Sequence, residues 1–368
     1  MWVAALAPAA AGQEAAEALR PLAWDRAPAL LDDAGGWGSL RTAIERSLAY
    51  YRRRPAEAEL RFGPRTAPVR AVARALGELA ALLARDPAPT AAEVERAVRA
   101  RFELVESSAG SEVLFTGYYE PVIEASLTRQ PGYEVPIYRL PPGGSSLTRA
   151  EIRGAAGLAG QGLELAWARS RVDAFFVEVQ GSGSLRLPSG ELRRFGYAGS
   201  NAHPYRSIGK LLIAEGKAAP GEMSMQWLRR YLAEASPGEV ARVLEHNASF
   251  VFFRWLPGEP EGALGQPVTP GRSIATDLRL MPRGALAFLA TTRPVRGADG
   301  EVTAAPLRRF VLNQDTGGAI RGPGRVDVFW GRGPEAAETA GLMQQRGRLL
   351  FLVPREGGQA GQGSESGG

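Results

Sequence analysis

The chain has 368 residues, a formal net charge of +5 and no cysteine, and its sequence pI is near 9.7. Without Cys it cannot form disulfides, Cys-ligated zinc sites or cysteine nucleophiles. Its two histidines, His203 and His246, make a Ser-His-Asp enzyme or a multi-His metal site hard to build. Hydrolytic or lytic chemistry would therefore run on carboxylates. The positive charge carries little weight, because the composition is rich in Arg and Ala throughout.

The two ends of the chain differ in composition from the rest. Residues 1–12 form a short apolar run with small residues, which resembles an export signal that lacks its basic start. Residues 356–368 consist mainly of Gly, Ser and Gln and are predicted to be disordered. No run of 18 or more apolar residues occurs, so the sequence predicts no transmembrane helix.

The segment from residue 13 to residue 103 is predicted to be helical. Asp32 and Asp33 precede an apolar pattern of helical period and are expected to cap that helix. Thr90 and Glu93 have the spacing of a capping box at the start of a later helix. Nothing here indicates chemistry, so we expect these helices to pack against a core formed later in the chain.

From Glu112 to Trp255 strands and helices are predicted to alternate. Apolar residues alternate at Phe175, Val177 and Val179, which is the period of a strand. The predicted strands are Val113–Pro121, Val135–Leu140, Asp173–Gln180, Leu185–Leu187, Leu192–Tyr197 and Ser249–Trp255. The predicted helices and helical turns are Thr148–Gly154, Glu164–Arg171, Tyr205–Gly216, Met223–Ala235 and Pro237–His246.

From Gly262 to Pro354 the sequence predicts a second β region. A helix is predicted at Pro334–Gln345, before the last strand. The strands are predicted at Leu286–Thr291, Arg308–Asn313, Val326–Trp330 and Arg348–Val353.

The candidate chemistry lies between two of these strands. Asp315 and Asp327 sit in or beside them, and the link that joins them is rich in glycine. Gly317 and Gly318 have access to positive φ, which would let the backbone turn sharply and approach a ligand closely. This pattern is typical of a pocket floor. The alternative is an ordinary β-turn with two solvated carboxylates.

The triplet Asp315-Thr316-Gly317 after an apolar strand also occurs in aspartic peptidases. Those enzymes need two carboxylates that share a proton, each from its own copy of the motif. The chain contains no second copy, so this alternative requires a homodimer.

Further polar clusters combine aromatic rings, carboxylates, amides and hydroxyls on glycine-flexible backbone. Rings stack on sugar faces, and the polar groups bond sugar hydroxyls. Taken singly, each cluster is more typical of a turn or a solvated face. The candidate substrate-binding residues are Thr116, Tyr118, Tyr119, Glu120, Gln180, Ser182, Ser200, Asn201, Lys210, Ser224, Gln226, Thr316, Gly317 and Gly318.

Taken in order, these clusters resemble one family, the membrane-bound lytic murein transglycosylase A family. The resemblance covers roughly residues 110–354 and includes a three-aspartate domain around Asp277, Asp315 and Asp327. The other matching motifs are Phe115–Pro121, Asp173–Gly183, Tyr197–Lys210, Ser224–Trp227 and Asn247–Phe253.

The resemblance implies a carbon–oxygen lyase that acts on peptidoglycan. It would break the β-1,4 bond between N-acetylmuramic acid and N-acetylglucosamine without water, and leave a 1,6-anhydromuramoyl end. The alternative is a non-catalytic glycan-binding protein on the same scaffold. Neither a cofactor nor a metal is expected.

The resemblance also implies an α+β, mostly β fold with two domains. A double-psi β-barrel domain with N-terminal helices would comprise residues 13–118 and 242–355. A smaller β-barrel-like domain, residues 119–241, would be inserted, with the glycan in the groove between them.

The implied setting is the periplasm or cell envelope, with glycan strands as the partner and no nucleic acid. A monomer is expected, and peripheral association with the outer membrane or with cell-wall enzymes is compatible with the family. Two departures stand out. Family members are typically lipoproteins, whereas this chain has no Cys to carry lipid, and Glu178 stands where Gln is expected.

Asp327 matches the catalytic aspartate of the family. Its strand neighbours are apolar, and shielding from water is expected to keep the carboxyl protonated near neutral pH. One carboxyl can protonate the leaving oxygen and then take the proton of the muramoyl C6 hydroxyl, which the sugar itself holds near the anomeric carbon. Asp315 is expected to assist through its charge or by orienting Asp327, and Asp277 is the third candidate.

Overall fold

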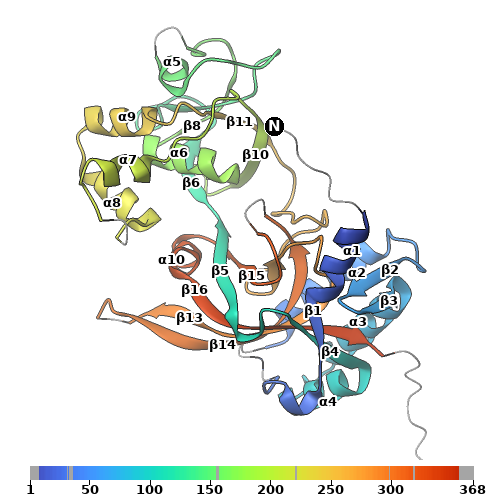
Figure 1. Ribbon diagram of the computed structural model, residues 1–368. Helices are drawn as coiled ribbons and strands as arrows, with labels where there is room; N and C mark the ends of the chain where they lie inside the picture. Colours follow the sequence, from blue (N-terminus) through green and yellow to red (C-terminus); the bar gives the residue numbers. More distant parts are fainter. Residues whose placement is uncertain are drawn as a thin grey trace, which may run out of the picture. The chain divides into compact units, whose positions relative to one another are not determined.

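The computed structural model divides the chain into two compact units (Figure 1). The barrel unit comprises residues 1–118, 260–331 and 338–368, and the inserted unit comprises residues 119–259 and 332–337. The predicted tail and the start of the predicted signal segment, residues 1–7, lie outside the described residues. The described residues are 8–30, 32, 36–154, 157–219, 222–297, 299–317 and 320–355.

Six strands of the barrel unit close into a barrel (Figure 1). Their hydrogen-bonded order is β16-β13-β14-β12-β15-β5, and β5 pairs again with β16 to complete the ring. β12 runs parallel to β14 and antiparallel to β15. The six strands are β5 (Val113–Glu120), β12 (Ser273–Ala275), β13 (Leu286–Arg296), β14 (Val302–Asp315), β15 (Arg325–Arg332) and β16 (Gln344–Pro354).

The N-terminal helices share one apolar core with the barrel. Leu76 of α3, Phe288 of β13 and Leu350 of β16 are each 0 % exposed within a single cluster. The predicted packing of these helices against a later core is therefore confirmed. The N-terminal elements are α1 (Pro8–Glu17), β1 (Leu19–Leu22), η1 (Trp24–Arg26), α2 (Gly38–Tyr51), β2 (Glu59–Phe62), β3 (Arg65–Pro68), α3 (Val69–Leu83), α4 (Ala91–Arg101), β4 (Phe102–Ser107) and η2 (Gly110–Glu112).

The two predicted helix caps have different outcomes. Thr90 and Glu93 form the predicted capping box at the start of α4. The prediction for Asp32 is wrong, because α2 begins without any side-chain cap. Asp32 instead accepts hydrogen bonds from both terminal nitrogens of the buried Arg272. Without Asp32, the charge of Arg272 would be unpaired in the core. Asp33 lies outside the described residues.

The inserted unit is built on a six-stranded sheet of order β11-β10-β9-β6-β8-β7. An isolated bridge between Arg139, just after β7, and Phe253 of β11 brings the two ends of this order together. Its strands are β6 (Val122–Ser126), β7 (Val135–Tyr138), β8 (Glu164–Ala168), β9 (Ser182–Arg186), β10 (Leu192–Ser200) and β11 (Val251–Trp255). Its helices are α5 (Arg149–Arg153), α6 (Arg171–Gln180), α7 (Ile208–Ala214), α8 (Met225–Glu234) and α9 (Pro237–Glu245).

Two predicted elements of the inserted unit are wrong. The predicted strand at Asp173–Gln180 is helix α6, which Ser170 caps at its start and Gly181 ends with a φ of 80°. Five consecutive residues of α6 are buried, so the alternating apolar residues that indicated a strand are only part of a helix covered on several sides. Conversely, the predicted helical turn at Glu164–Arg171 begins with strand β8, which pairs with β6 and β7.

The other predicted strands and helices are present with shifted ends. The segment predicted to be helical, residues 13–103, also contains the strands β1, β2 and β3, each of four residues and therefore too short to show a clear period. β13 and β14 run further than predicted, as a hairpin that pairs Leu286 with Leu312 at one end and Arg296 with Val302 at the other. The predicted helix before the last strand is α10 (Pro334–Leu342). None of the helices in the described part of the chain combines the length and the hydropathy that a bilayer crossing requires.

Candidate active site

Asp315 and Asp327 lie on either side of the short strand β12. Ala275 of β12 pairs with Asp315 of β14 and with Asp327 of β15. Neighbouring strands lie ~4.8 Å apart, so the two backbones that carry the carboxylates are about 10 Å apart. Residues paired side by side point to the same face of a sheet. The two carboxylates therefore share one face of the barrel, with the small side chain of Ala275 between them.

Strand β5 binds both carboxylates through alternate residues. The Thr116 hydroxyl donates to Asp327 Oδ1, and the Tyr118 hydroxyl donates to Asp315 Oδ2 at 2.8 Å. Because side chains two apart on a strand point to the same face, one strand holds both groups in place. Two of the predicted substrate-binding residues thus meet two of the predicted catalytic residues.

Gly117, between these two residues, allows β5 to lie close to its neighbours. A Cβ at this position would come within 2.8 Å of the Trp330 ring and 2.7 Å of Ala340 Cα. The Tyr118 ring also packs on Phe329, with ring centroids 5.1 Å apart. Any side chain at residue 117 would therefore displace the strand that holds the two carboxylates.

The carboxylate of Asp327 is partly open to solvent. Its side chain is 21 % exposed, and Arg325 Nε lies 3.9 Å from its Oδ1. That Nε is buried and has no hydrogen-bond partner among the described residues. A carboxylate offers about four lone-pair sites. Asp327 therefore keeps capacity for a further donor.

Asp315 accepts more hydrogen bonds than Asp327 does. Besides Tyr118, it accepts hydrogen bonds from the backbone N–H groups of Ala263, at 3.0 Å, and of Thr316, at 2.8 Å. Burial raises the pKa of Asp315, these three donors lower it, and the charge of Asp327 raises it slightly. Burial also raises the pKa of Tyr118 well above its ordinary value, with Asp315 as the next cause. Tyr118 therefore remains a hydrogen-bond donor near neutral pH.

Two fully buried amides fix the strand that ends at Asp315. Gln314 donates to the Ala43 carbonyl and to Ser47 of α2, both at 2.9 Å. Asn313 accepts from Thr276 at 2.8 Å and donates to the Pro282 carbonyl at 2.9 Å. Satisfied polar groups in a core specify one backbone position, so this network determines where Asp315 points.

Asp277, the third predicted catalytic residue, has a different environment. Its side chain is 2 % exposed, and it accepts hydrogen bonds from the Arg279 guanidinium at 2.7 and 2.9 Å. It also accepts the Gly322 N–H at 3.1 Å. The Arg279 bonds are the largest cause that lowers the pKa of Asp277. These contacts make Asp277 a carboxylate that ties the segment around Gly322 to the turn at residue 277.

The start of the segment after Asp315 is held by a hydrogen bond and by close packing. The Thr316 hydroxyl donates to the Thr276 carbonyl at 2.8 Å, which holds the start of the segment. Gly317 does not adopt the positive φ to which it has access, whereas Gly322 does, with a φ of 79°. A Cβ at Gly317 would meet Ile320 at 3.1 Å, so the residue serves close packing. Gly318 lies outside the described residues.

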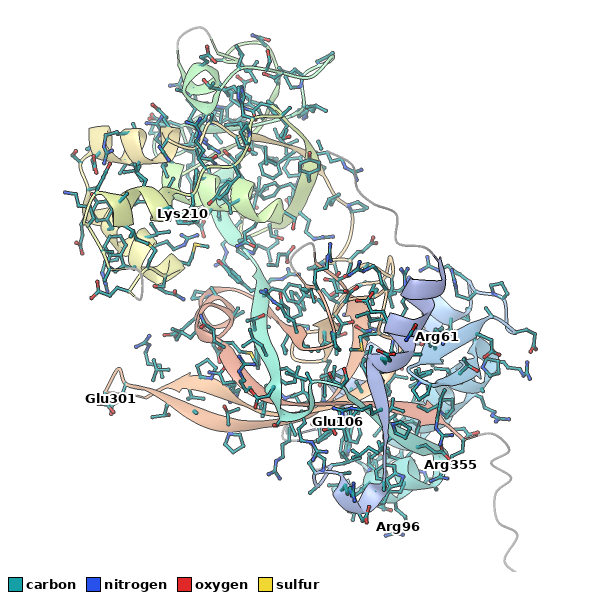
Figure 2. All side chains as sticks on the ribbon, in the orientation of Figure 1. Arg61, Arg96, Glu106, Lys210, Glu301 and Arg355 are labelled. Carbon is teal, nitrogen blue, oxygen red and sulfur yellow. The ribbon has the colours of Figure 1, made fainter. Side chains whose placement is uncertain are left out.

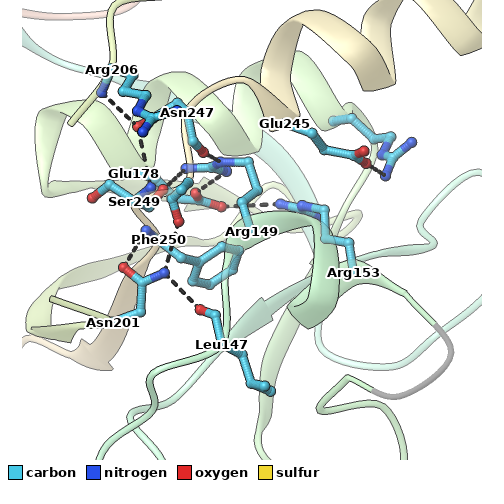
Figure 3. A network of polar contacts seen from close by, with 12 residues as sticks. Leu147, Arg149, Arg153, Glu178, Asn201, Arg206, Glu245, Asn247, Ser249 and Phe250 are labelled. Atoms are coloured by element: carbon cyan, nitrogen blue, oxygen red, sulfur yellow. Dashed lines mark hydrogen bonds and ion pairs between the residues drawn. The ribbon is translucent and has the colours of Figure 1, made fainter. Parts of the chain in front are cut away.

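In the inserted unit, Asn201 belongs to a buried polar network (Figure 3). Its side chain amide donates to the carbonyls of Leu147 and Ala248, both at 2.8 Å, and its oxygen accepts the Phe250 N–H at 2.8 Å. Asn201 is 2 % exposed. All three of these hydrogen bonds are made with backbone groups of the chain itself, so the Asn201 side chain stabilises a turn.

Glu178, where Gln was expected, is the acidic centre of the same network. It accepts hydrogen bonds from Arg149 and, at 3.0 Å, from Arg153. Arg149 also donates to the carbonyls of Asn247 and Ser249. The side chains of Arg149 and Glu178 are 2 % and 4 % exposed. Glu178 is thus a partner of buried guanidiniums.

Glu120, predicted to bind substrate, is also buried, at 6 % exposure. Its Oε1 accepts from Arg194 at 3.0 Å and from Ser184 at 3.1 Å. Its Oε2 lies 3.2 Å from Arg332 Nε. These contacts join the two segments, around residues 120 and 332, where the chain enters the inserted unit.

The remaining candidate substrate-binding residues of the inserted unit differ in exposure and in hydrogen bonding. Gln180, Ser182 and Lys210 are exposed, the last on α7 (Figure 2). Ser224 caps α8 by accepting the Trp227 N–H. The Oε1 atom of Gln226 is buried without a hydrogen-bond partner among the described residues. The partly buried candidates are Tyr119 and Ser200.

Sequence reasoning missed three contacts of the two central carboxylates. Arg325 stands two residues before Asp327 on one strand, and the period of two would have placed them on one face. No sequence signal links Ala263 to Asp315 across 52 positions, or places Ala275 between the two carboxylates. The position of Ala275 depends on strand pairing, and the contact of Ala263 depends on a turn that only the tertiary structure brings to Asp315.

Comparison with known proteins connects this geometry to a family. Residues 114–254 match the MltA specific insert domain, and residues 272–353 match the 3D domain. The membrane-bound lytic murein transglycosylase A of Escherichia coli K12 is 40 % identical over 248 residues, which are 67 % of each protein. The protein of the same name from Vibrio cholerae is 40 % identical over 245 residues, or 65 % of each protein.

Solved structures extend the similarity over more of the chain. A lytic transglycosylase of Burkholderia pseudomallei matches with a TM-score of 0.68 and 34 % identity, over 92 % of this chain and 96 % of that one. The E. coli MltA structure with bound chitohexaose matches with a TM-score of 0.64 and 31 % identity, over 85 % of this chain and 90 % of that one. The likeness thus includes both sequence and fold.

Proposed function

The chain belongs to the membrane-bound lytic murein transglycosylase A family and is a lytic transglycosylase of peptidoglycan; we propose that Asp327 transfers the proton in its reaction. The observation that carries this proposal is the position of Asp327 between Thr116 and Arg325, with a side chain that remains 21 % exposed. The chitohexaose bound to the E. coli relative supports a glycan strand as the ligand of this chain.

In the proposed reaction the substrate supplies its own nucleophile. Asp327 gives its proton to the glycosidic oxygen while the bond from that oxygen to the anomeric carbon of N-acetylmuramic acid breaks. The Asp327 carboxylate then takes the proton of the C6 hydroxyl of the same sugar, whose oxygen bonds to the anomeric carbon. The proton count balances, water is not consumed, and the product carries a 1,6-anhydro end. Because the C6 hydroxyl is tethered, one acid–base residue suffices.

The contacts of Asp327 support both halves of this cycle. The Thr116 hydroxyl can donate to the carboxylate ion, and the Arg325 guanidinium can move about 1 Å to form a charge-assisted hydrogen bond with it. Asp315 lies on the same barrel face, and the charge of Asp327 raises the pKa of Asp315, so the two carboxylates interact. Asp315 is therefore proposed as the second carboxylate, which acts on Asp327 through its charge.

The proposed setting is the periplasm or cell envelope, where the peptidoglycan substrate lies. The relatives named membrane-bound support an envelope location. We expect the chain to act on glycan strands as a monomer, in peripheral association with the outer membrane or with other cell-wall enzymes.

Product analysis tests the proposed reaction. Sacculi digested with the purified chain should release muropeptides with 1,6-anhydro ends, which mass spectrometry distinguishes from reducing ends by the mass of one water. Reducing ends would indicate a hydrolase, and binding without cleavage would indicate a glycan-binding protein. Cleavage of a protein substrate that pepstatin blocks would indicate the homodimeric aspartic peptidase.

A further inference from the structure

A cavity lies wholly within the inserted unit and is lined by none of the three barrel carboxylates. Its volume is about 730 Å³, which is within the range of sites for small ligands, roughly 300–1,000 Å³. Strands β7 and β8 and helix α5 contribute its walls. None of the candidate substrate-binding residues lines it.

One wall of the cavity is apolar and aromatic. Pro136 of β7 pairs with Trp167 of β8, so the two side chains lie side by side on the sheet, and Ile152 of α5 adds to the apolar lining. The Trp167 side chain is half-buried, and its indole N–H makes no hydrogen bond to any described residue. An aromatic wall with an unused donor suits a ligand that is partly apolar and partly polar.

The floor of the cavity is charged but already satisfied. Arg153 belongs to the buried network around Glu178 and is 8 % exposed (Figure 3). Glu164 accepts the Gly160 N–H at 3.1 Å, and Arg171 lies 3.6 Å from Glu245. Each of these charges has a partner in the chain, so none of the three needs a ligand to neutralise or bond it.

The rim presents two charges of opposite sign. Arg129 and Glu134 both line the cavity and are exposed. Within the described residues neither forms an ion pair or a side-chain hydrogen bond. A ligand that carried both a carboxylate and an ammonium group would complement this pair, whereas an uncharged sugar would form an ion pair with neither residue.

We propose that this cavity binds a short zwitterionic peptide, with a ligand carboxylate on Arg129, an ammonium group on Glu134 and the apolar part against Trp167. The inference rests on the proposed function, because the stem peptides of peptidoglycan carry free carboxylates and, before cross-linking, a free amino group. The inserted unit would then recognise the peptide of the same polymer whose glycan the barrel unit cleaves.

A titration with a free peptide tests the site directly. The probe is the tetrapeptide L-alanyl-γ-D-glutamyl-meso-diaminopimelyl-D-alanine, added to the full chain and followed by calorimetry. We expect saturable one-to-one binding, which R129E and W167A each weaken by about tenfold, the scale of one lost charge-assisted contact. The matched control is R186E, since Arg186 is 51 % exposed on β9 and lies outside the cavity; its affinity should stay within about twofold of the parent.

Two outcomes of the titration would overturn the proposal. One is the absence of saturable binding by the unchanged chain, and the other is an equal loss of affinity in R186E. Chitotriose provides a further check, because displacement of the tetrapeptide by this uncharged glycan would assign the cavity to sugar instead.

Kinetics separate the peptide site from the proposed function. R129E and W167A should cleave peptide-free glycan at the parent rate and should raise the KM for peptide-bearing glycan several-fold. An unchanged KM for the peptide-bearing substrate would refute the stem peptide as the ligand. A chain that binds the tetrapeptide but cleaves neither glycan would refute the proposed function while supporting the peptide site.

Discussion

The barrel unit and the inserted unit use acidic residues in opposite ways. In the inserted unit, Glu178 is 4 % exposed and bonds two guanidiniums, those of Arg149 and Arg153. In the barrel unit, Asp327 is 21 % exposed, bonds the Thr116 hydroxyl and lies 3.9 Å from a guanidinium that it does not bond. A carboxylate saturated by cations holds the fold together. One that is incompletely engaged remains able to exchange a proton.

The three aspartates predicted as catalytic differ in the same respect, namely how far hydrogen-bond donors occupy the carboxylate. Asp277 resembles Glu178, because a guanidinium and two backbone N–H groups occupy its carboxylate. Asp315 is intermediate, since its three donors are uncharged. Residues of one sequence motif therefore receive different roles from their surroundings. The comparison predicts which substitutions affect rate and which affect stability.

The largest expected effect is on the rate of the Asp327→Ala variant. Loss of the general acid should reduce the rate of anhydromuropeptide release by at least ~100-fold. The melting temperature should change little, because the side chain is partly exposed and makes few contacts. Mass spectrometry of timed sacculus digests measures the rate, and calorimetry checks the fold. Release at a near-parent rate would show that Asp327 does not transfer the proton. It would also contradict the inference that incomplete hydrogen bonding marks the reactive carboxylate.

Glu178→Ala should act on stability instead. Removal of one partner of a buried ion cluster leaves uncompensated charge and typically costs about 3–5 kcal/mol. Urea unfolding should show this loss, with the rate per folded molecule unchanged. The matched control is Glu191→Ala, because the Glu191–Arg193 pair is exposed and such pairs contribute little. Equal effects of the two substitutions would contradict the structural role of Glu178.

Asp315 should give the barrel unit a pH-dependent stability. Burial raises the pKa of Asp315 in the folded chain, so the folded state holds the proton more tightly than the unfolded state. This contribution is fully present below the ordinary Asp pKa of about 3.9 and is lost as pH rises through the raised value. Relative to Asp315→Asn, the parent should therefore lose stability as pH increases from about 4. Melting temperatures recorded across pH measure the difference, and parallel curves would exclude the effect.

Tyr118→Phe sharpens the preceding test. The Tyr118 hydroxyl is the strongest of the donors that lower the pKa of Asp315, so its removal should extend the loss of stability to higher pH.

The smallest effect is expected at Arg325. Its guanidinium is 39 % exposed, so solvent screens its influence on Asp327. Arg325→Gln should lower the rate of anhydromuropeptide release by less than about fivefold, because the cation would stabilise the carboxylate left after proton transfer only across a partly exposed contact. Arg325→Lys should retain most of the parent rate, and high salt should reduce the difference. Equal rates of the parent and Arg325→Gln would show that Arg325 does not act on Asp327.

The sequence correctly indicated where most strands run. Periodicity placed the barrel strands other than β12, and the Thr90–Glu93 box started α4 as predicted, because both signals act over a few residues. The alternation that predicted a strand at residues 173–180 failed, since burial on several sides of α6 places apolar residues on more than one face of the helix. Local pattern alone does not report how many sides of an element are covered.

The sequence by itself also determined the family, through motifs that keep their order along the chain. Only the tertiary structure decided which acidic groups are saturated and which are not. Asp315 and Asp327 become neighbours across Ala275 because a parallel and an antiparallel pairing meet on one three-residue strand. Arg272 forms an ion pair with Asp32, which lies 240 positions earlier in the chain. The physical reason is that a carboxylate's role depends on the donors and the solvent around it, and residues remote in sequence provide both.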